Sequence, residues 1–160
     1  TWSSQNFLQS NDCYHVAHYD PCDPSWPTLV LETFETIFKQ IFKLFQNASD
    51  TDSEFLNTLF HCVTELIRTY SVYNDLSEVQ LKTLILIIRT NIGNFGTQNH
   101  VFSCLKAIVS RKFLCADLYD LMEQVEDMMV TSISQSTRQV CSSIFIQFLL
   151  EYPLEEKRIT

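Results

Sequence analysis

TQNHVFSCLKAIVSRKFLCADLYDLMEQVEDMMVTSISQSTRQVCSSIFIQFLLEYP, from Thr97 to Pro153, is the stretch of the 160-residue chain that decides its fold. Apolar residues recur in it at intervals of three and four, the spacing that places them on one side of an α-helix. The pattern predicts three amphipathic helices joined by short connections. In the middle helix the apolar positions are Leu118, Leu121, Met122, Val125, Met128 and Met129.

The last helix of this stretch is predicted over residues 134–152. Ser134 or Ser136 is placed to cap its start, and Pro153 is placed to end it. Because the connection from the middle helix is short, these two helices must pack antiparallel. Neither helix buries its apolar side alone, and this dependence on a neighbour is typical of stacked helical repeats.

The helical period extends upstream of this stretch. Thr51 with Glu54, and Ser77 with Gln80, have the spacing of capping boxes, and Thr97 is placed to cap a helix. Residues 84–88 are apolar throughout and also suit a buried strand, but the apolar face continues for nearly four turns, which favours a helix. The chain has only two glycines, and this scarcity argues against a barrel or a sandwich.

Six helices are therefore predicted, paired as hairpins. The hairpins span residues 28–73, 77–112 and 116–152, so their starts are 49 and 39 residues apart. This period falls in or near the HEAT and armadillo range of about 40 to 47 residues. We predict an all-α superhelix of such hairpins over residues 27–153, with 1–26 irregular and 154–160 starting the next linker or repeat. The chain is expected to be a fragment of a longer protein.

Arg138 is the candidate for bracing one repeat against the next. The segment from Thr137 to Cys141 resembles the opening of a HEAT second helix, in which an arginine usually has that role. The alternative is a surface arginine on a first helical turn.

The net charge of -8 is unevenly distributed. Residues 1–80 hold three Lys or Arg against eleven Asp or Glu, whereas residues 81–160 hold eight of each. The acidic first half would repel nucleic acid. Lys106, Arg111 and Lys112 form a small basic patch and are the candidates for contact with a partner or RNA. Cations at a helix C-terminus, where they favour the dipole, explain this trio without RNA and are the preferred interpretation.

The metal and catalytic candidates in the sequence are weak. Cys13, His15, His18 and Cys22 are all zinc-type ligands, but their crowded spacing matches no zinc module, so no metal is predicted. His61 and Cys62 are adjacent and therefore point about 100° apart on a helix, which is a poor arrangement for base and nucleophile. We predict a non-enzymatic protein without a cofactor or small-molecule substrate.

The cysteines and the hydropathy pattern predict the cellular location and redox environment of the protein. Cys62, Cys104 and Cys141 lie on or beside apolar stripes, where free cysteine behaves as a small hydrophobe. No apolar run approaches the roughly 20 residues that span a membrane. An intracellular, reducing location without membrane contact is expected.

Three segments carry a resemblance to a known family: VFSCLKAIVSRKF (101–113), LYDLMEQVEDMMVTS (118–132) and VCSSIFIQFLLEYPLEEKR (140–158). They resemble a region of the down-regulated-in-metastasis family, very large nucleolar HEAT-repeat proteins of the small-subunit processome. The likeness covers residues 99–158 well and fades through 29–98.

The resemblance implies a non-catalytic scaffold in pre-ribosomal RNA processing, located in the nucleolus and bound to processome proteins and to pre-rRNA or snoRNA. The chain departs from the family at Glu155 and Glu156, where basic residues are expected. This departure weakens the case for RNA contact at that point. The alternative function is a helical-repeat adaptor for protein–protein interaction in transport or signalling.

Overall fold

The computed structural model describes residues 26–48, 52–69 and 76–153. In these ranges the chain forms six α-helices and no strand, which confirms the predicted fold class. The helices are α1 (Trp26–Asn47), α2 (Ser53–Thr69), α3 (Glu78–Asn91), α4 (Gln98–Ser110), α5 (Ala116–Thr131) and α6 (Gln135–Glu151).

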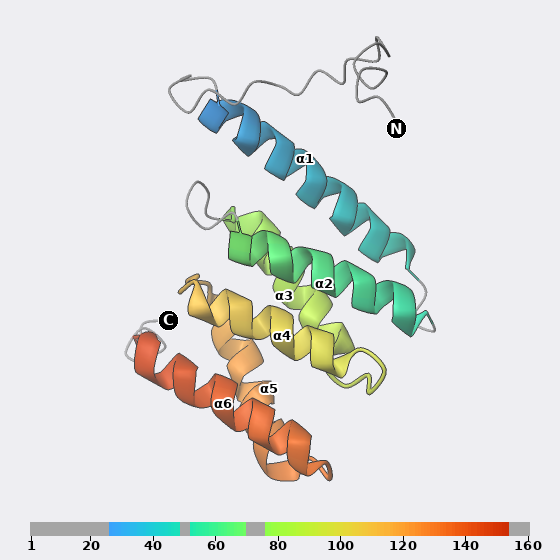
Figure 1. Ribbon diagram of the computed structural model, residues 1–160. Coiled ribbons are helices and arrows are strands. Elements are labelled where there is room, and N and C mark those ends of the chain that lie inside the picture. The colour runs from blue at the N-terminus through green and yellow to red at the C-terminus, as the bar shows by residue number, and fades with distance from the viewer. Residues whose placement is uncertain (1–25, 49–51, 70–75, 154–160) are drawn as a thin grey trace, which may run out of the picture.

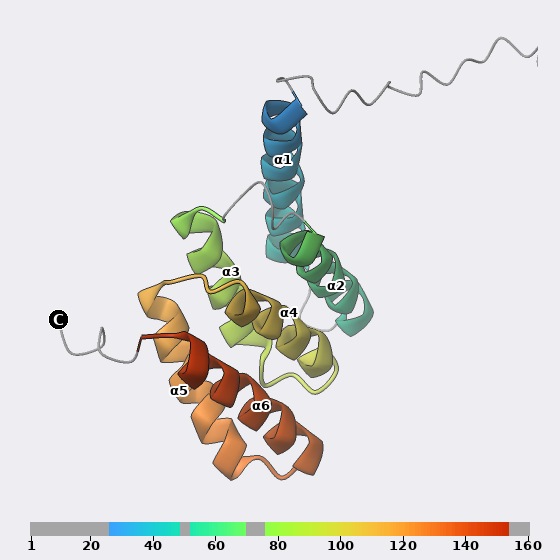
Figure 2. The same cartoon turned by 60° about the vertical axis from the view of Figure 1, so that its left-hand side comes forward.

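The six helices form a stack of antiparallel hairpins. α2, α4 and α6 lie side by side and run in the same direction, and α3 and α5 form a second layer behind them (Figures 1 and 2). α4 packs on α2, α3 and α6, while α1 packs on α2 at one end of the stack. Each hairpin thus buries its apolar side against the next one, as expected of a helical-repeat superhelix.

α4 lies at the centre of the core because it has neighbours on both sides in its own layer. Five of its side chains have no exposed surface: Val101, Cys104, Leu105, Ile108 and Val109. The apolar run at residues 84–88 is helical as predicted. Leu84, Ile85 and Ile88 are buried, whereas Leu86 is 61% exposed.

The helix starts confirm two predicted caps. The Ser77 hydroxyl accepts from the Gln80 amide at 3.3 Å, and the Gln80 side chain accepts from the Ser77 amide at 3.0 Å. The Ser134 hydroxyl accepts from the Thr137 amide at 3.3 Å, so Ser134 and not Ser136 caps α6. Each cap satisfies an amide that has no partner within the helix.

Two other predicted caps differ. At the start of α2 the Asp52 carboxylate accepts from the Phe55 amide at 3.0 Å, so Asp52 is the cap. The predicted cap, Thr51, lies outside the described residues. Thr97 has the N-cap position of α4, but its hydroxyl makes no cap bond. It instead donates to the carbonyls of Asn91 and Asn94 at 3.4 and 3.3 Å, because it is fully buried beside the end of α3.

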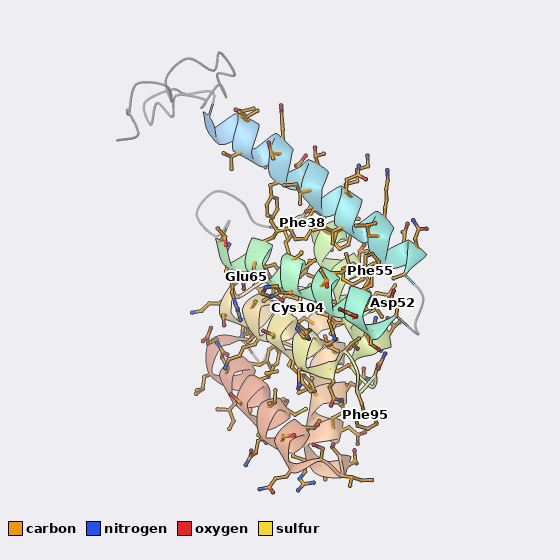
Figure 3. All side chains as sticks on the ribbon, turned by 45° about the vertical axis from the view of Figure 1, so that its right-hand side comes forward. Phe38, Asp52, Phe55, Glu65, Phe95 and Cys104 are labelled. Carbon is orange, nitrogen blue, oxygen red and sulfur yellow. The ribbon has the colours of Figure 1, made fainter. Side chains whose placement is uncertain are left out.

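α1 buries only one of its two apolar sides. Phe34, Phe38, Ile41 and Phe45 are buried where α1 packs on α2, and Figure 3 shows Phe38 between these helices. The wide apolar surface of residues 28–47 predicts packing on both sides. That prediction is wrong for the described residues, in which Ile37 and Leu44 remain 36% and 43% exposed because no neighbouring helix covers them.

Candidate interaction surface

Three cationic side chains gather where α2 and α4 end. Because the two helices run in the same direction, their C-terminal ends lie at the same edge of the stack (Figure 1). A hollow of about 270 Å³ there is lined by Arg68, Lys106, Ala107, Ser110 and Arg111. Lys112 follows directly in the sequence. We call the hollow together with Lys112 the basic groove.

Arg68 belongs to α2 and was not among the sequence candidates. Its guanidinium lies 3.1 Å from the Glu65 carboxylate, and its side chain is 51% exposed. A second nitrogen of the same group donates to the Ser103 hydroxyl of α4 at 3.4 Å. Arg68 therefore joins α2 to α4, its neighbour in the same layer, at the rim of the basic groove.

The three predicted basic residues have different surroundings. Lys106 is exposed on α4, and none of the described residues forms an ion pair or hydrogen bond with its ammonium group. Arg111 is half-buried, with its guanidinium carbon 5.5 Å from the centre of the Phe113 ring. Lys112 is 65% exposed, and its ammonium nitrogen lies 4.0 Å from the Glu151 carboxylate.

The carbonyls at the end of α4 are satisfied without the cationic side chains. The Lys106 carbonyl accepts from the Ser110 hydroxyl at 2.8 Å. The next three carbonyls accept from the backbone amides of Arg111 and Lys112. The Tyr152 hydroxyl also reaches two of those carbonyls, at 3.5 and 3.4 Å. The ammonium groups of Lys106 and Lys112 are thus not used as hydrogen-bonding caps, although they remain favourably placed for the helix dipole.

Polar side chains connect successive hairpins. The buried Thr137 of α6 donates its hydroxyl to the Gln98 side-chain oxygen of α4 at 3.0 Å. The Asn57 side chain of α2 donates to the Gly96 carbonyl at 3.0 Å. Both contacts join residues 39 positions apart, the spacing between the starts of the last two predicted hairpins. The sequence shows this spacing between the last two hairpins, but the spacing alone did not identify these four residues as partners.

Arg138 is anchored within its own hairpin. One of its nitrogens donates to the carbonyls of Ser132 and Ile133 at 2.6 and 3.0 Å, in the turn between α5 and α6. These bonds hold the turn in place. The predicted bracing of an adjacent repeat by Arg138 stays a prediction.

Most of the cysteines in the described part of the chain are buried. Cys104, Cys115 and Cys141 are buried and free, while Cys62 is free and exposed, unlike a residue on a buried stripe. Burial raises the pKa of Cys104 to about 12 and that of Cys141 to about 11. Both thiols are therefore protonated and unreactive at neutral pH.

The zinc candidates Cys13, His15, His18 and Cys22 lie outside the described residues. Among the residues that the structure describes, no group of three or more His, Cys, Asp or Glu side chains is arranged to hold a metal ion. No helix in the described ranges has both the length and the apolar character that a membrane-crossing helix requires.

Comparison with known proteins gives two similar sequences. The chain is 30% identical over 121 residues to the U3 small nucleolar RNA-associated protein 20 of Schizosaccharomyces pombe, a match covering 76% of this chain. It is 25% identical over 128 residues, or 80% of its length, to the protein of the same name from Saccharomyces cerevisiae. Each match spans 5% of the relative's length. No protein-family profile and no solved structure matches the chain.

Proposed function

We propose that this chain is a non-catalytic scaffold segment in small ribosomal subunit biogenesis, acting in pre-rRNA processing. The observation that carries the proposal is the similarity of 76% of the chain to a protein named for its association with U3 small nucleolar RNA. The relatives' name favours this function over an adaptor in transport or signalling. It does not name the down-regulated-in-metastasis family to which the sequence bears a resemblance.

The architecture supports a scaffold role. The described residues form successive hairpins, each of which buries its apolar side on the next. Such a stack presents a long surface whose shape is set by the small rotation between neighbouring hairpins. Its polar contacts, such as Gln98 with Thr137, fix adjacent hairpins relative to each other. A fixed surface of this kind holds partners in a defined arrangement without performing chemistry on them.

The proposal includes partners and a location. The partners are proteins of the small-subunit processome, together with pre-rRNA or snoRNA, and the location is the nucleolus. The residue range 27–153 is proposed as a run of HEAT-like repeats, with Arg138 as a bracing residue between repeats. The chain matches 5% of the length of each relative. The proposed role is therefore that of a whole protein of this kind, to which the chain contributes a segment.

The proposal is tested by affinity purification of the tagged protein from growing cells of its source. We expect U3 snoRNA and pre-rRNA to be enriched over an untagged control, and depletion of the protein to slow pulse-labelled maturation of the small-subunit rRNA. A second tagged nuclear protein of similar abundance controls for non-specific RNA. Unchanged rRNA maturation after depletion, with no enrichment of U3 snoRNA, contradicts the proposed function.

A further inference from the structure

We propose that the outer side of the α1–α2 hairpin binds an amphipathic helix of a partner protein. A hollow of about 360 Å³ lies on this side, and we call it the apolar groove. Its lining residues are Ile37, Ile41, Cys62, Glu65, Leu66 and Thr69. The proposal rests on this groove and does not depend on the proposed function in ribosome biogenesis.

The two walls of the apolar groove are stripes with helical spacing. The stripe on α2 follows intervals of four, three, four and three residues and consists of Phe55, Leu59, Cys62, Leu66 and Thr69. The stripe on α1 follows intervals of four and three and consists of Ile37, Ile41 and Leu44. Such intervals place each stripe along one side of its helix. Figure 3 shows Phe55 and Glu65 toward opposite ends of α2, so the α2 stripe runs along most of this helix.

The burial of these side chains describes a packed floor and an open rim. Ile41 is buried and Leu66 is partly buried, whereas Ile37 is 36% exposed and Cys62 is exposed. Glu65 is the one charged residue among those that line the groove, and its carboxylate already lies 3.1 Å from the Arg68 guanidinium. Recognition at this groove therefore relies on burial of apolar side chains.

The groove continues the interface that already joins the hairpins. α4 packs on α2 at one side and on α6 at the other, whereas α2 packs on α4 and α1, and no described helix covers the groove. The end of a helical stack that faces water has a polar outer side. An apolar outer side is instead typical of one that a further helix covers.

The groove also defines the chemistry of that helix. The α2 stripe spans fourteen residue steps, which correspond to about 21 Å or about four turns of helix. A helix that lies in such a groove carries apolar side chains at positions i, i+3 or i+4, and i+7. The expected partner segment is therefore an amphipathic helix of about four turns.

The sequence favours a helix from another protein over one from this chain. In a continuous stack of such hairpins, a helix that precedes α1 is expected within residues 1–25. That segment has no sustained apolar spacing of three and four, and it contains Pro21 and Pro24. A helix supplied by a partner protein fills the position that the chain's own sequence does not.

The test is photo-crosslinking of the tagged protein in growing cells of its source. The photoreactive residue p-benzoylphenylalanine replaces Cys62, which is exposed in the groove. We expect a crosslink to a peptide of another protein, with apolar residues at the spacing given above. The same replacement at Leu86 on α3, which is 61% exposed and outside the groove, is the matched control and should not crosslink to that peptide.

The second measurement is binding of a synthetic, fluorescent copy of the crosslinked peptide to the whole chain by anisotropy. Ile37→Glu places a charge in the apolar groove and should weaken binding at least tenfold, whereas Leu86→Glu should weaken it less than twofold. Thr69→Glu is a second groove variant at an exposed position, in case Ile37→Glu alters the fold. Circular dichroism checks that each variant remains helical.

Three outcomes overturn the proposal: no crosslink from position 62, a crosslink to residues 1–25 of the same chain, or equal losses of peptide binding in the groove and control variants. The second result would assign the groove to a contact within the chain. The proposed role in rRNA maturation fails separately, through depletion in cells. A protein that is required for maturation but gives no crosslink from position 62 would refute this inference alone.

Discussion

The Thr137 hydroxyl of α6 donates to the Gln98 side-chain oxygen of α4 at 3.0 Å, across the boundary between two hairpins. Both residues are buried, at 6% and 7% exposure. Gln98 also donates its amide to the Ile92 carbonyl at 2.9 Å, which ties the end of α3 into the same arrangement. One glutamine thereby links three helices in a part of the core with little water.

Thr137→Val is expected to lower the free energy of unfolding by about 1 to 3 kcal/mol. The valine has nearly the same shape but leaves the buried Gln98 oxygen without its donor. The measurement is urea unfolding followed by circular dichroism. We expect the double variant Gln98→Leu/Thr137→Val to lose less free energy of unfolding than the sum of the losses in the two single variants. Strict additivity of the single effects would show that the bond contributes nothing specific.

Gly96→Ala is expected to destabilise the fold more than Gly93→Ala, by about 1 to 2 kcal/mol. A methyl group added at Gly96 would lie 2.6 Å from the Ser53 hydroxyl and 3.1 Å from its Cβ, whereas one at Gly93 meets no atom within 4 Å. The Gly96 carbonyl also accepts from Asn57, so movement of the loop loosens α2. Comparison of the two melting temperatures tests this prediction. Equal melting temperatures would show that Ser53 moves away from the added methyl group without loss of stability.

Alkaline pH is expected to reduce stability through Cys104. The pKa of the folded thiol is raised by burial from 9.0 to about 12. The Cys104 thiol therefore ionises at a lower pH in the unfolded chain than in the folded protein. Its contribution to stability is fully present below pH 9 and is lost between pH 9 and 12. Raising the pH from 8 to 10 should lower the free energy of unfolding by about 1.4 kcal/mol through this single thiol.

The Cys104 prediction is checked by urea unfolding of the unaltered protein and of Cys104→Ala at both pH values. Other raised groups, such as Cys141 and Tyr152, are present in both proteins, so their effects cancel in the difference. The alanine variant should be less stable overall but lose about 1.4 kcal/mol less on the same pH change. Identical pH dependence in the two proteins contradicts the assigned cause.

Arg138→Ala is expected to lower the free energy of unfolding by about 1.5 to 3 kcal/mol, the range for hydrogen bonds made by charged groups. The arginine binds the carbonyls of Ser132 and Ile133, which close the turn from α5 to α6. Arg89→Ala on the exposed side of α3 is the matched control. The two variants are compared by thermal unfolding. An equal loss of stability in both would show that the contacts of Arg138 with the turn do not stabilise the fold.

The sequence by itself determined the helices of this protein. Apolar spacing and local caps act within one or two turns, so the capping box of Ser77 and Gln80 and the helical state of residues 84–88 follow from neighbours in the chain. The antiparallel pairing of α5 with α6 also follows, because the short link between them permits little else.

Only the tertiary structure decided which side chains meet across hairpins. Contacts such as Gln98 with Thr137, and the approach of Arg68 to Lys106 and Arg111, depend on how each helix is rotated and tilted on its neighbour. Helix period leaves that rotation and tilt open, because a broad apolar side packs acceptably over a range of angles. The packing of whole layers sets the rotation and tilt, and with them the position of the basic groove.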